Sequence, residues 1–206
     1  MPQEMRYGRC LLPIRLKQKT QGNAYTLYKM GLRRILLTML PALAAAAVCG
    51  SCISESGETS EETTLVSAGD TAPDFTVEMT DGSYVTLSHL RGRIVLLGFW
   101  SPDCPMCQDE MRAVQHDVID RIEGTDIRYL PVARDGSRDV IEEFCRQNGC
   151  EFAVGLDPDR SIYMLYATSF VPRMFVIDRD GIVRASYVEY GTDRLGEIVS
   201  AAEALP

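Results

Sequence analysis

The chain has 206 residues, of which 46% are hydrophobic and 8% aromatic, and its formal net charge is −8. These values suit one globular domain with additional segments. Residues 1–52 hold eight Lys or Arg and one Glu, which leaves 13 basic and 28 acidic residues for the rest of the chain. Because so acidic a body is repelled by phosphate groups, we expect no nucleic acid among its partners.

The N-terminal quarter of the chain has the pattern of a targeting segment. Residues 1–29 show no clear periodicity, and we interpret them as an upstream extension. A secretory signal is predicted over residues 30–52, because Arg33 and Arg34 precede a largely apolar run of fourteen residues, 35–48. A helix that spans a bilayer needs about 20 such residues, so a permanent membrane helix is the weaker alternative.

The predicted signal ends in small residues and cysteine, a pattern similar to bacterial lipoprotein signals. Gly50 and Ser51 precede Cys52, which we predict to be lipidated. Lipidation of Cys49, and simple cleavage to a secreted protein, are the alternatives. The next residues, 53–69, are rich in Ser, Thr and Glu and poor in large apolar groups, which predicts a flexible acidic tether.

Residues 70–206 alternate between strand and helix patterns and are predicted to form the folded domain. The apolar run 93–99 predicts a central strand that is buried on both faces. Other strands are expected at 75–79, 84–87, 127–133, 174–178 and 182–188, and helices at 104–123, 137–149, 159–167 and 194–205. The alternation indicates an α/β fold, and hairpins across the turns at 80–83 and 179–181 make its sheet mixed.

Two cysteines, Cys104 and Cys107, stand between the predicted central strand and the helix that follows it. Asp103 is a suitable N-cap, and Pro105 is tolerated in a first helical turn. We therefore expect Cys104 at the exposed start of the helix, where the helix dipole favours a thiolate. Cys107 lies one turn further in. An exposed attacking sulfur and a shielded resolving sulfur are what dithiol exchange requires.

Glu110 falls on the buried stripe of the same predicted helix, three residues after Cys107 and four before Val114. A buried carboxyl group is costly unless it has a partner or a role. Beside Cys107, it is placed to take the proton of that thiol during exchange. The structural alternative is a Glu110 side chain that reaches the surface.

Zinc binding is the competing use of a Cys-x-x-Cys pair. A structural zinc site needs four ligands at recognisable spacing, and neither His89 nor His116 is adjacent to a cysteine. Cys145 and Cys150 lie on a different element, where they straddle a helix end and either form a second disulfide or stay free as structural cysteines. We favour redox chemistry and expect neither a metal nor another cofactor.

Three segments, one of them the cysteine segment, occur together in a specific order: AGDTAPDFTVEMTDGSYVTLSHLRGRIVLLGFW, CPMCQDEM and FVPRMFVIDRDGIV. With them, residues 68–206 resemble thioredoxin-fold proteins, and most closely the membrane-tethered, TlpA-like thiol–disulfide oxidoreductases of the redoxin (AhpC/TSA) superfamily. The resemblance implies a thioredoxin-like three-layer sandwich with a mixed central sheet and an N-terminal β-hairpin extension.

The resemblance also assigns roles to residues of this chain. It implies that Cys104 is the nucleophile, Cys107 the resolving cysteine and Glu110 the acid of the site. It further implies that Pro172 is a cis proline that faces the disulfide. Val171, directly before it, would offer its backbone to a bound peptide.

Two residues depart from the family pattern at the expected substrate-binding surface. Asp103 replaces the usual Trp before the first cysteine, and its negative charge opposes a thiolate there. Arg173 replaces the usual Thr after the proline and offers a positive charge to offset it. Trp100 is expected either in the core or as a wall of the site. Gly98 stands where thioredoxin carries a buried Asp, which fits a glutamate on the helix in that role.

The function implied by the resemblance is disulfide exchange with envelope proteins that carry thiols or disulfides. The protein would be anchored by its lipid on the periplasmic side of a membrane and would act as a reductant, fed by a membrane electron donor, for example in cytochrome c maturation. Two alternatives stay open. One is a peroxiredoxin-like peroxidase, although the segment PDCPMC lacks the Thr of the peroxidatic motif. The other is a tethered binding module without turnover, which Asp103 favours.

Overall fold

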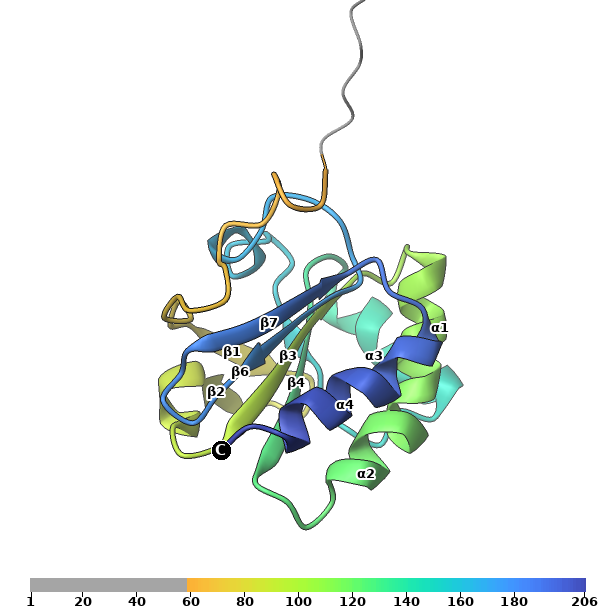
Figure 1. Cartoon of the computed structure of the whole chain (residues 1–206). Coiled ribbons are helices and arrows are strands. Elements are labelled where there is room, and N and C mark those ends of the chain that lie inside the picture. The colour runs from red at the N-terminus through yellow and green to blue at the C-terminus, as the bar shows by residue number, and fades with distance from the viewer. Residues whose placement is uncertain (1–58) are drawn as a thin grey trace, which may run out of the picture. The chain divides into compact units, whose positions relative to one another are not determined.

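The computed structural model describes residues 59–206, so the predicted signal, Cys52 and the start of the tether lie outside the described residues. A mixed sheet organises the described part (Figure 1). Its strands are β1 (Thr76–Met79), β2 (Tyr84–Thr86), β3 (Ile94–Trp100), β4 (Ile127–Ala133), β5 (Gly155–Leu156), β6 (Arg173–Ile177) and β7 (Val183–Val188). Their order is β2-β1-β5-β4-β3-β6-β7. β3 is parallel to β4 and antiparallel to β6, which confirms the predicted mixed sheet.

The α-helices of the described part are α1 (Pro105–Val114), α2 (Asp120–Ile122), α3 (Arg138–Asn148) and α4 (Leu195–Glu203). A π-helical turn, Gln115–Ile119, joins α1 to α2 where the sequence predicts one continuous helix. The buried Val114, Val118 and Ile122 are four residues apart, a spacing that drifts by about 40° per step around a regular helix. The wider π turn offsets this drift. No helix within residues 59–206 is long and apolar enough to cross a membrane.

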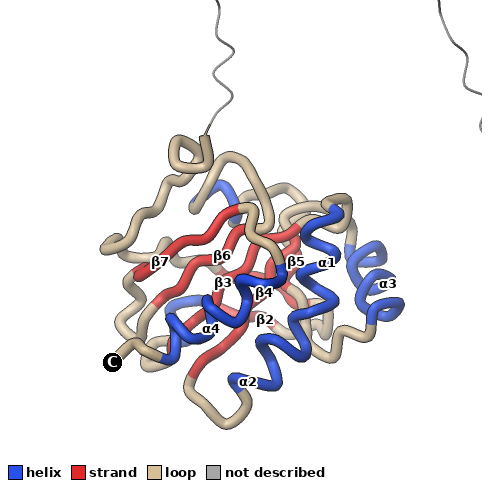
Figure 2. The backbone as a smooth tube through the Cα atoms, turned by 45° about the vertical axis from the view of Figure 1, so that its right-hand side comes forward, coloured by secondary structure: helices blue, strands red, loops and turns tan. Residues whose placement is uncertain are grey.

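The sheet separates two cores, because successive residues of a strand point to opposite faces. Ile94 and Leu96 of β3 pack with residues of α1, α2 and α4, which lie in front of the strands in Figure 2. Val95 and Leu97 pack on the other face with shorter segments, among them the 3-10 turn Tyr163–Leu165. The helices, the sheet and these segments form the predicted three layers.

The predicted N-terminal hairpin is formed by β1 and β2, and it joins the main sheet through β5. β5 pairs antiparallel with β1 and parallel with β4. The sequence did not indicate this strand, because two residues are too few to show a period. Gly155 is required there, since a Cβ would lie 2.8 Å from Cγ2 of Val77 and 3.2 Å from Cγ2 of Val132.

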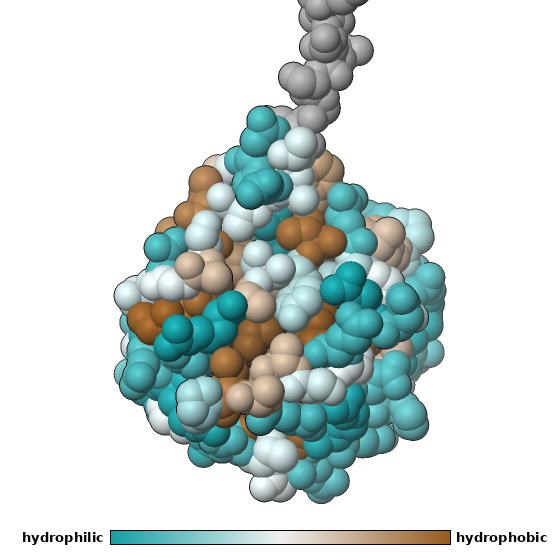
Figure 3. All heavy atoms as spheres, in the orientation of Figure 1, coloured by the Kyte–Doolittle hydropathy of each residue, from teal (hydrophilic) through white to brown (hydrophobic). Residues whose placement is uncertain are grey.

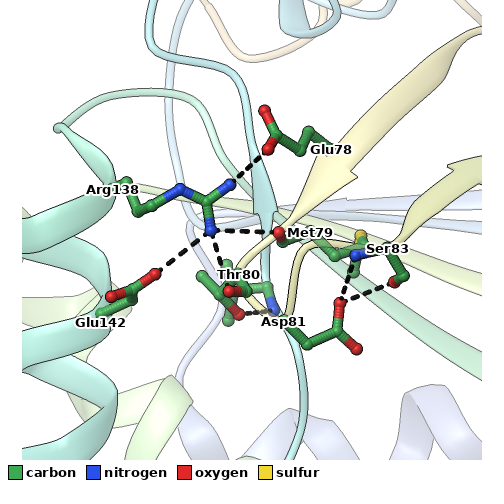
Figure 4. A network of polar contacts seen from close by, with 8 residues as sticks. Glu78, Met79, Thr80, Asp81, Ser83, Arg138 and Glu142 are labelled. Atoms are coloured by element: carbon green, nitrogen blue, oxygen red, sulfur yellow. Dashed lines mark hydrogen bonds and ion pairs between the residues drawn. The ribbon is translucent and has the colours of Figure 1, made fainter.

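Arg138, at the start of α3, connects that helix to the hairpin (Figure 4). Its guanidinium donates to the carbonyl of Thr80 at 2.8 Å and to Oε1 of Glu78 at 2.6 Å. Thr80 also holds the approach to β5, because its N–H donates to the carbonyl of Val154 and its hydroxyl accepts from the Val154 N–H. Both the beginning of α3 and the segment before β5 are therefore fixed to the hairpin.

The helix expected at 159–167 is reduced to the 3-10 turn Tyr163–Leu165. The cause is Asp157, whose carboxylate accepts hydrogen bonds from the backbone N–H groups of Ile162 and Tyr163, at 3.0 and 2.7 Å. These short polar links fix the chain in a compact turn that does not continue as an α-helix.

The sequence predicts a flexible tether over residues 53–69. The structure corrects this expectation for residues 59–69, which are packed on the domain. Thr63 and Val66 are buried. The N–H of Thr168 donates to the carbonyl of Thr63 at 2.9 Å, and a β-bridge follows one residue later. Composition pointed to a free chain because Ser, Thr and Glu cannot form a core alone. Here two of these residues serve instead as hydrogen-bonding partners of the domain.

Candidate active site

The site begins where β3 ends and α1 starts. Cys104 is the N-cap residue of α1, with an extended backbone (φ −96°, ψ 113°), and its sulfur accepts a hydrogen bond from the Cys107 N–H at 3.2 Å. Pro105 occupies the first turn, as predicted. The expectation that Asp103 is the N-cap is wrong: Asp103 lies one residue further out and is exposed. Cys104 thus occupies the position where an anionic side chain receives the free helical N–H groups.

A second segment, distant in sequence, meets Cys104. The Val171–Pro172 peptide bond is cis, as the family resemblance implies. The carbonyl of Val171 lies 3.7 Å from the Cys104 sulfur and accepts its S–H. Cys104 and Val171 are both partly exposed. The nucleophile and a backbone acceptor therefore share one accessible edge.

Cys107 lies beneath Cys104 and has no exposed surface. It belongs to a cluster with Trp100, Met111 and Ile141. Burial raises the pKa of the Cys107 thiol, and its contact with Cys104 and the nearby Glu110 act in the same direction. Cys107 is therefore held as a neutral thiol, and its reaction requires a group that removes its proton.

Glu110 is the carboxyl group that lies nearest along the same helix face. Its side chain is buried, and its Oε1 accepts a 2.6 Å hydrogen bond from the hydroxyl of Tyr190. Oε2 is also buried and has no hydrogen-bond partner among the described residues. Burial raises the pKa of Glu110 to about 7, while the hydrogen bond from Tyr190 lowers it. A carboxyl group with this pKa can both accept and return a proton near neutral pH.

Tyr190 is the site residue that sequence reasoning missed. It follows β7 and is eighty positions from Glu110 in the chain. Nothing in its neighbourhood marks it, because a tyrosine after a strand is an ordinary core residue. Only the packing of the segment after β7 against α1 brings the hydroxyl to the carboxyl group.

Gly98 leaves no room for the buried acid found in thioredoxin. A Cβ at this position would lie 3.2 Å from the hydroxyl oxygen of Tyr129 and 3.4 Å from Cε of Met174. Tyr129 in turn contacts the sulfur of Met111 through its hydroxyl, at 3.7 Å. Side chains of β4 and β6 fill this space, and the buried acid of this site is therefore Glu110 on α1.

Two residues expected to bind substrate lie elsewhere. Arg173 is fully buried and points to the N-terminal segment, where it donates to the hydroxyls of Thr64 at 2.6 Å and Thr63 at 3.1 Å. It therefore does not offset the charge of Asp103 at the surface. Trp100 is 1% exposed and packs against Phe144, with ring centroids 5.1 Å apart and ring planes tilted by 47°. It supports the site from inside the core.

The surface around the nucleophile is formed by Asp103, Pro105 and Met106, all exposed, together with Val171. It combines a negative charge with apolar groups. On the face shown in Figure 3, hydrophobic residues form a broken band between hydrophilic ones. Within residues 59–206, no three His, Cys, Asp or Glu side chains are grouped so that they could hold a metal ion.

A thioredoxin-type sheet with a Cys-x-x-Cys pair at a helix start and a cis proline opposite it defines a thioredoxin-fold redox domain. The profile of the AhpC/TSA family matches residues 68–186, more than half of the chain. This chain belongs to the AhpC/TSA family.

Similar proteins and structures agree with this assignment. The thiol–disulfide oxidoreductase ResA of Bacillus subtilis is 32% identical over 119 residues, and that of Geobacillus thermodenitrificans is 28% identical over 123. These stretches cover 57% and 60% of this chain, and 65% and 70% of the two relatives. The chain thus spans slightly less than two thirds of the Bacillus subtilis protein.

Two solved structures have the same fold. A candidate protein disulfide isomerase from Bacteroides thetaiotaomicron shares 30% identity with a TM-score of 0.64, over 68% of this chain and 91% of that one. A candidate thiol:disulfide interchange protein DsbE from Chlorobium tepidum shares 27% identity with a TM-score of 0.62, over 68% and 97%.

Proposed function

We propose that this protein is a thiol–disulfide oxidoreductase that reduces disulfides of other proteins through Cys104 and Cys107. One observation carries the proposal: a partly exposed sulfur at the helix start lies above a fully buried thiol, with a buried carboxyl group next along the helix. The names of the ResA relatives support the same reaction class.

The first step is attack by the Cys104 thiolate on a substrate disulfide. A mixed disulfide forms between Cys104 and one substrate sulfur, and the other substrate sulfur leaves as a thiolate that takes up a proton. The N–H of Cys107, 3.2 Å from the Cys104 sulfur, stabilises the attacking anion. The carbonyl of Val171 beside it is positioned to accept an N–H from the substrate backbone.

The second step resolves the mixed disulfide. Glu110 takes the proton of the Cys107 thiol, and the resulting thiolate attacks the Cys104 sulfur. The Cys104–Cys107 disulfide forms and the second substrate sulfur leaves, so two electrons have passed from the protein to the substrate. Because the free Oε2 of Glu110 is buried, the proton is held close to the reacting sulfurs. A dithiol donor must then return two electrons to the pair.

We place this reaction in the cell envelope. The support is the sequence alone: a secretory signal at 30–52 and a lipidation cysteine, Cys52, ahead of the domain. A membrane electron donor and envelope proteins with thiols or disulfides, such as those of cytochrome c maturation, would then be the partners.

The test is insulin reduction by the full chain, with dithiothreitol as electron donor. We expect turnover by the wild type and none by Cys104→Ser. When Cys107→Ser is reduced beforehand and incubated with insulin without dithiothreitol, we expect a mixed disulfide between Cys104 and insulin to accumulate. Cys145→Ser, outside the site, is the matched cysteine control and keeps its turnover. Turnover by Cys104→Ser, or a mixed disulfide on any cysteine other than Cys104, contradicts the proposal.

The alternatives predict different results in the same preparation. A peroxidase consumes hydrogen peroxide rapidly, and a binding module is oxidised once without turnover. The direction of electron flow is read from equilibrium with glutathione. A reductant requires a potential more negative than about −230 mV, toward the value of about −270 mV for thioredoxin. A less negative value would assign the pair to disulfide formation or isomerisation.

A further inference from the structure

A second pair of cysteines lies at the C-terminal end of α3. The helix ends at Gly149 in the left-handed conformation (φ 69°, ψ 34°), and the N–H of Cys150 donates to the carbonyl of Cys145 at 3.0 Å. This closed turn is a frequent helix ending, and it brings the residues at its two ends into side-chain contact. Here both of these residues are cysteines.

The backbone geometry permits a disulfide between them. With a 3.0 Å hydrogen bond joining the two residues, standard bond lengths keep the Cα atoms within about 7 Å. This bound lies at the upper end of the separations that a disulfide spans. The shifts in pKa agree with this closeness, because the neighbouring Cys150 raises the pKa of Cys145 and the neighbouring Cys145 lowers that of Cys150.

The pair is accessible and is separate from the active site. Cys145 and Cys150 are both partly exposed, in contrast to the buried Cys107. Their neighbours face inward: Phe144 packs against Trp100, and Phe152 meets Tyr129 edge to face at 5.9 Å. A small reagent can therefore approach the sulfurs without entering the core.

The ends of the segment that carries the pair are fixed. Arg138 holds the start of α3 to the hairpin, as Figure 4 shows, and Thr80 holds Val154 just after the pair. The turn at 145–150 lies between these two attachments. Closing a disulfide within a turn that is already formed requires no movement of the helix.

We propose that Cys145 and Cys150 are a second redox site, which forms an intramolecular disulfide by exchange with small-molecule disulfides. The thiolate of one of these cysteines attacks one sulfur of the small disulfide, giving a mixed disulfide and releasing one thiolate. The sulfur of the other cysteine, after losing its proton to solvent, then displaces the second thiolate. Two electrons pass to the small disulfide, which leaves as two thiols. The reverse exchange with a small thiol restores the dithiol.

Trypsin separates the two disulfides of the oxidised protein. Cleavage after Arg138, Arg146 and Arg160 places Cys145 in peptide 139–146 and Cys150 in peptide 147–160, so only a disulfide can hold these peptides together. Cys104 and Cys107 share peptide 94–112, where a disulfide shows as the loss of two hydrogens. Failure of one pair is therefore distinguishable from failure of the other.

The experiment treats the full chain with glutathione disulfide, blocks remaining thiols with iodoacetamide, and analyses the digest without reduction by mass spectrometry. We expect the linked peptides 139–146 and 147–160 as the main oxidised form of this region. The same result is expected in the double variant Cys104→Ser/Cys107→Ser. Separate peptides that carry only iodoacetamide, or only glutathione, while 94–112 is oxidised, would overturn the proposal.

Single variants test whether the two cysteines act as a pair. In Cys145→Ser the exchange cannot be completed, so glutathione accumulates on Cys150, and in Cys150→Ser it accumulates on Cys145. A remaining cysteine that takes up no glutathione in either variant would overturn the proposal. Neither variant removes a residue of the active site.

Discussion

The hydroxyl of Tyr190 donates a 2.6 Å hydrogen bond to Oε1 of Glu110. A residue in the segment after β7 is therefore in direct contact with the acid of α1. The two side chains are buried, and the bond stabilises the charged form of the carboxyl group. Burial acts in the opposite direction and is the larger effect. The balance between them sets the pH at which this acid changes its charge.

Replacing Tyr190 with Phe should raise the pKa of Glu110 above its value of about 7. The variant keeps the buried ring and removes only the hydrogen bond that favours the carboxylate. We expect the pH profile of mixed-disulfide resolution to move upward by about one unit, since one hydrogen bond is worth about 1–2 kcal/mol. Stopped-flow measurement of the resolving step between pH 5 and 9 checks this. Tyr84→Phe, at an exposed hairpin position, is the control and leaves the profile in place.

Glu110 should make the fold less stable as pH rises. Its pKa is about 7 in the folded protein and 4.5 when unperturbed, so the folded state holds the proton more tightly. Below pH 4.5 the group is neutral in both states and costs nothing, and above pH 7 the full penalty of the buried charge applies. The free energy of unfolding should fall by about 3 kcal/mol across this range on account of this one group.

Glu110→Gln removes this pH dependence, because the amide stays neutral. Urea unfolding at pH 4.5 and pH 8 should show a smaller fall in the variant than in the wild type. The matched control is Asp109→Asn, on the exposed side of the same helix. Equal falls in wild type and Glu110→Gln would show that the carboxyl group does not carry a raised pKa. The resolving step should also slow in Glu110→Gln, since the amide cannot take the Cys107 proton.

Arg173→Met should destabilise the fold without slowing catalysis by the folded protein. The guanidinium is fully buried and donates to Thr63, Thr64 and the carbonyl of Ser169. Loss of these hydrogen bonds should cost about 2 kcal/mol and loosen residues 59–66, which protease sensitivity and amide exchange would report. Insulin reduction per folded molecule should stay near the wild-type rate. A lower rate at unchanged stability would instead place Arg173 at the substrate surface.

Gly155→Ala should weaken the join between the hairpin and the sheet. The added methyl group would lie 2.8 Å from Val77 and 3.2 Å from Val132, so β1 or β4 must shift. Overpacking of this kind typically costs about 1–3 kcal/mol. Gly196→Ala is the control, because that glycine lies in α4 with only the flexible end of Arg121 nearby, at 3.4 Å. Thermal unfolding should show a lower midpoint for the first variant and an equal or higher one for the second.

Patterns of several residues allowed much of this fold to be predicted. All seven residues of β3 are buried, as its continuous apolar run indicates. The hairpin β6–β7 and the end of α3 at Gly149 follow from turn chemistry that is local in sequence. For the same reason Cys104, Cys107 and Glu110 are found from spacing along one helix.

The features that were missed depend on contacts between distant segments. Tyr190 reaches Glu110 only through tertiary packing, and the guanidinium of Arg173 turns inward because Thr63 and Thr64 supply its acceptors. Neither contact leaves a periodic signal. The segment 59–69 has the composition of a linker, and only its partners on the domain give it a fixed course.

The hydrogen bond between Thr168 and Thr63 would limit how far the domain can move from a lipid anchor at Cys52. Eleven positions separate Cys52 from Thr63, and even a fully extended chain of that length reaches only about 40 Å. If Cys52 carries the proposed lipid, the catalytic edge would stay in a shallow zone next to the bilayer. Proteins elsewhere in the surrounding compartment would then have to come to the membrane for their disulfides to be reduced.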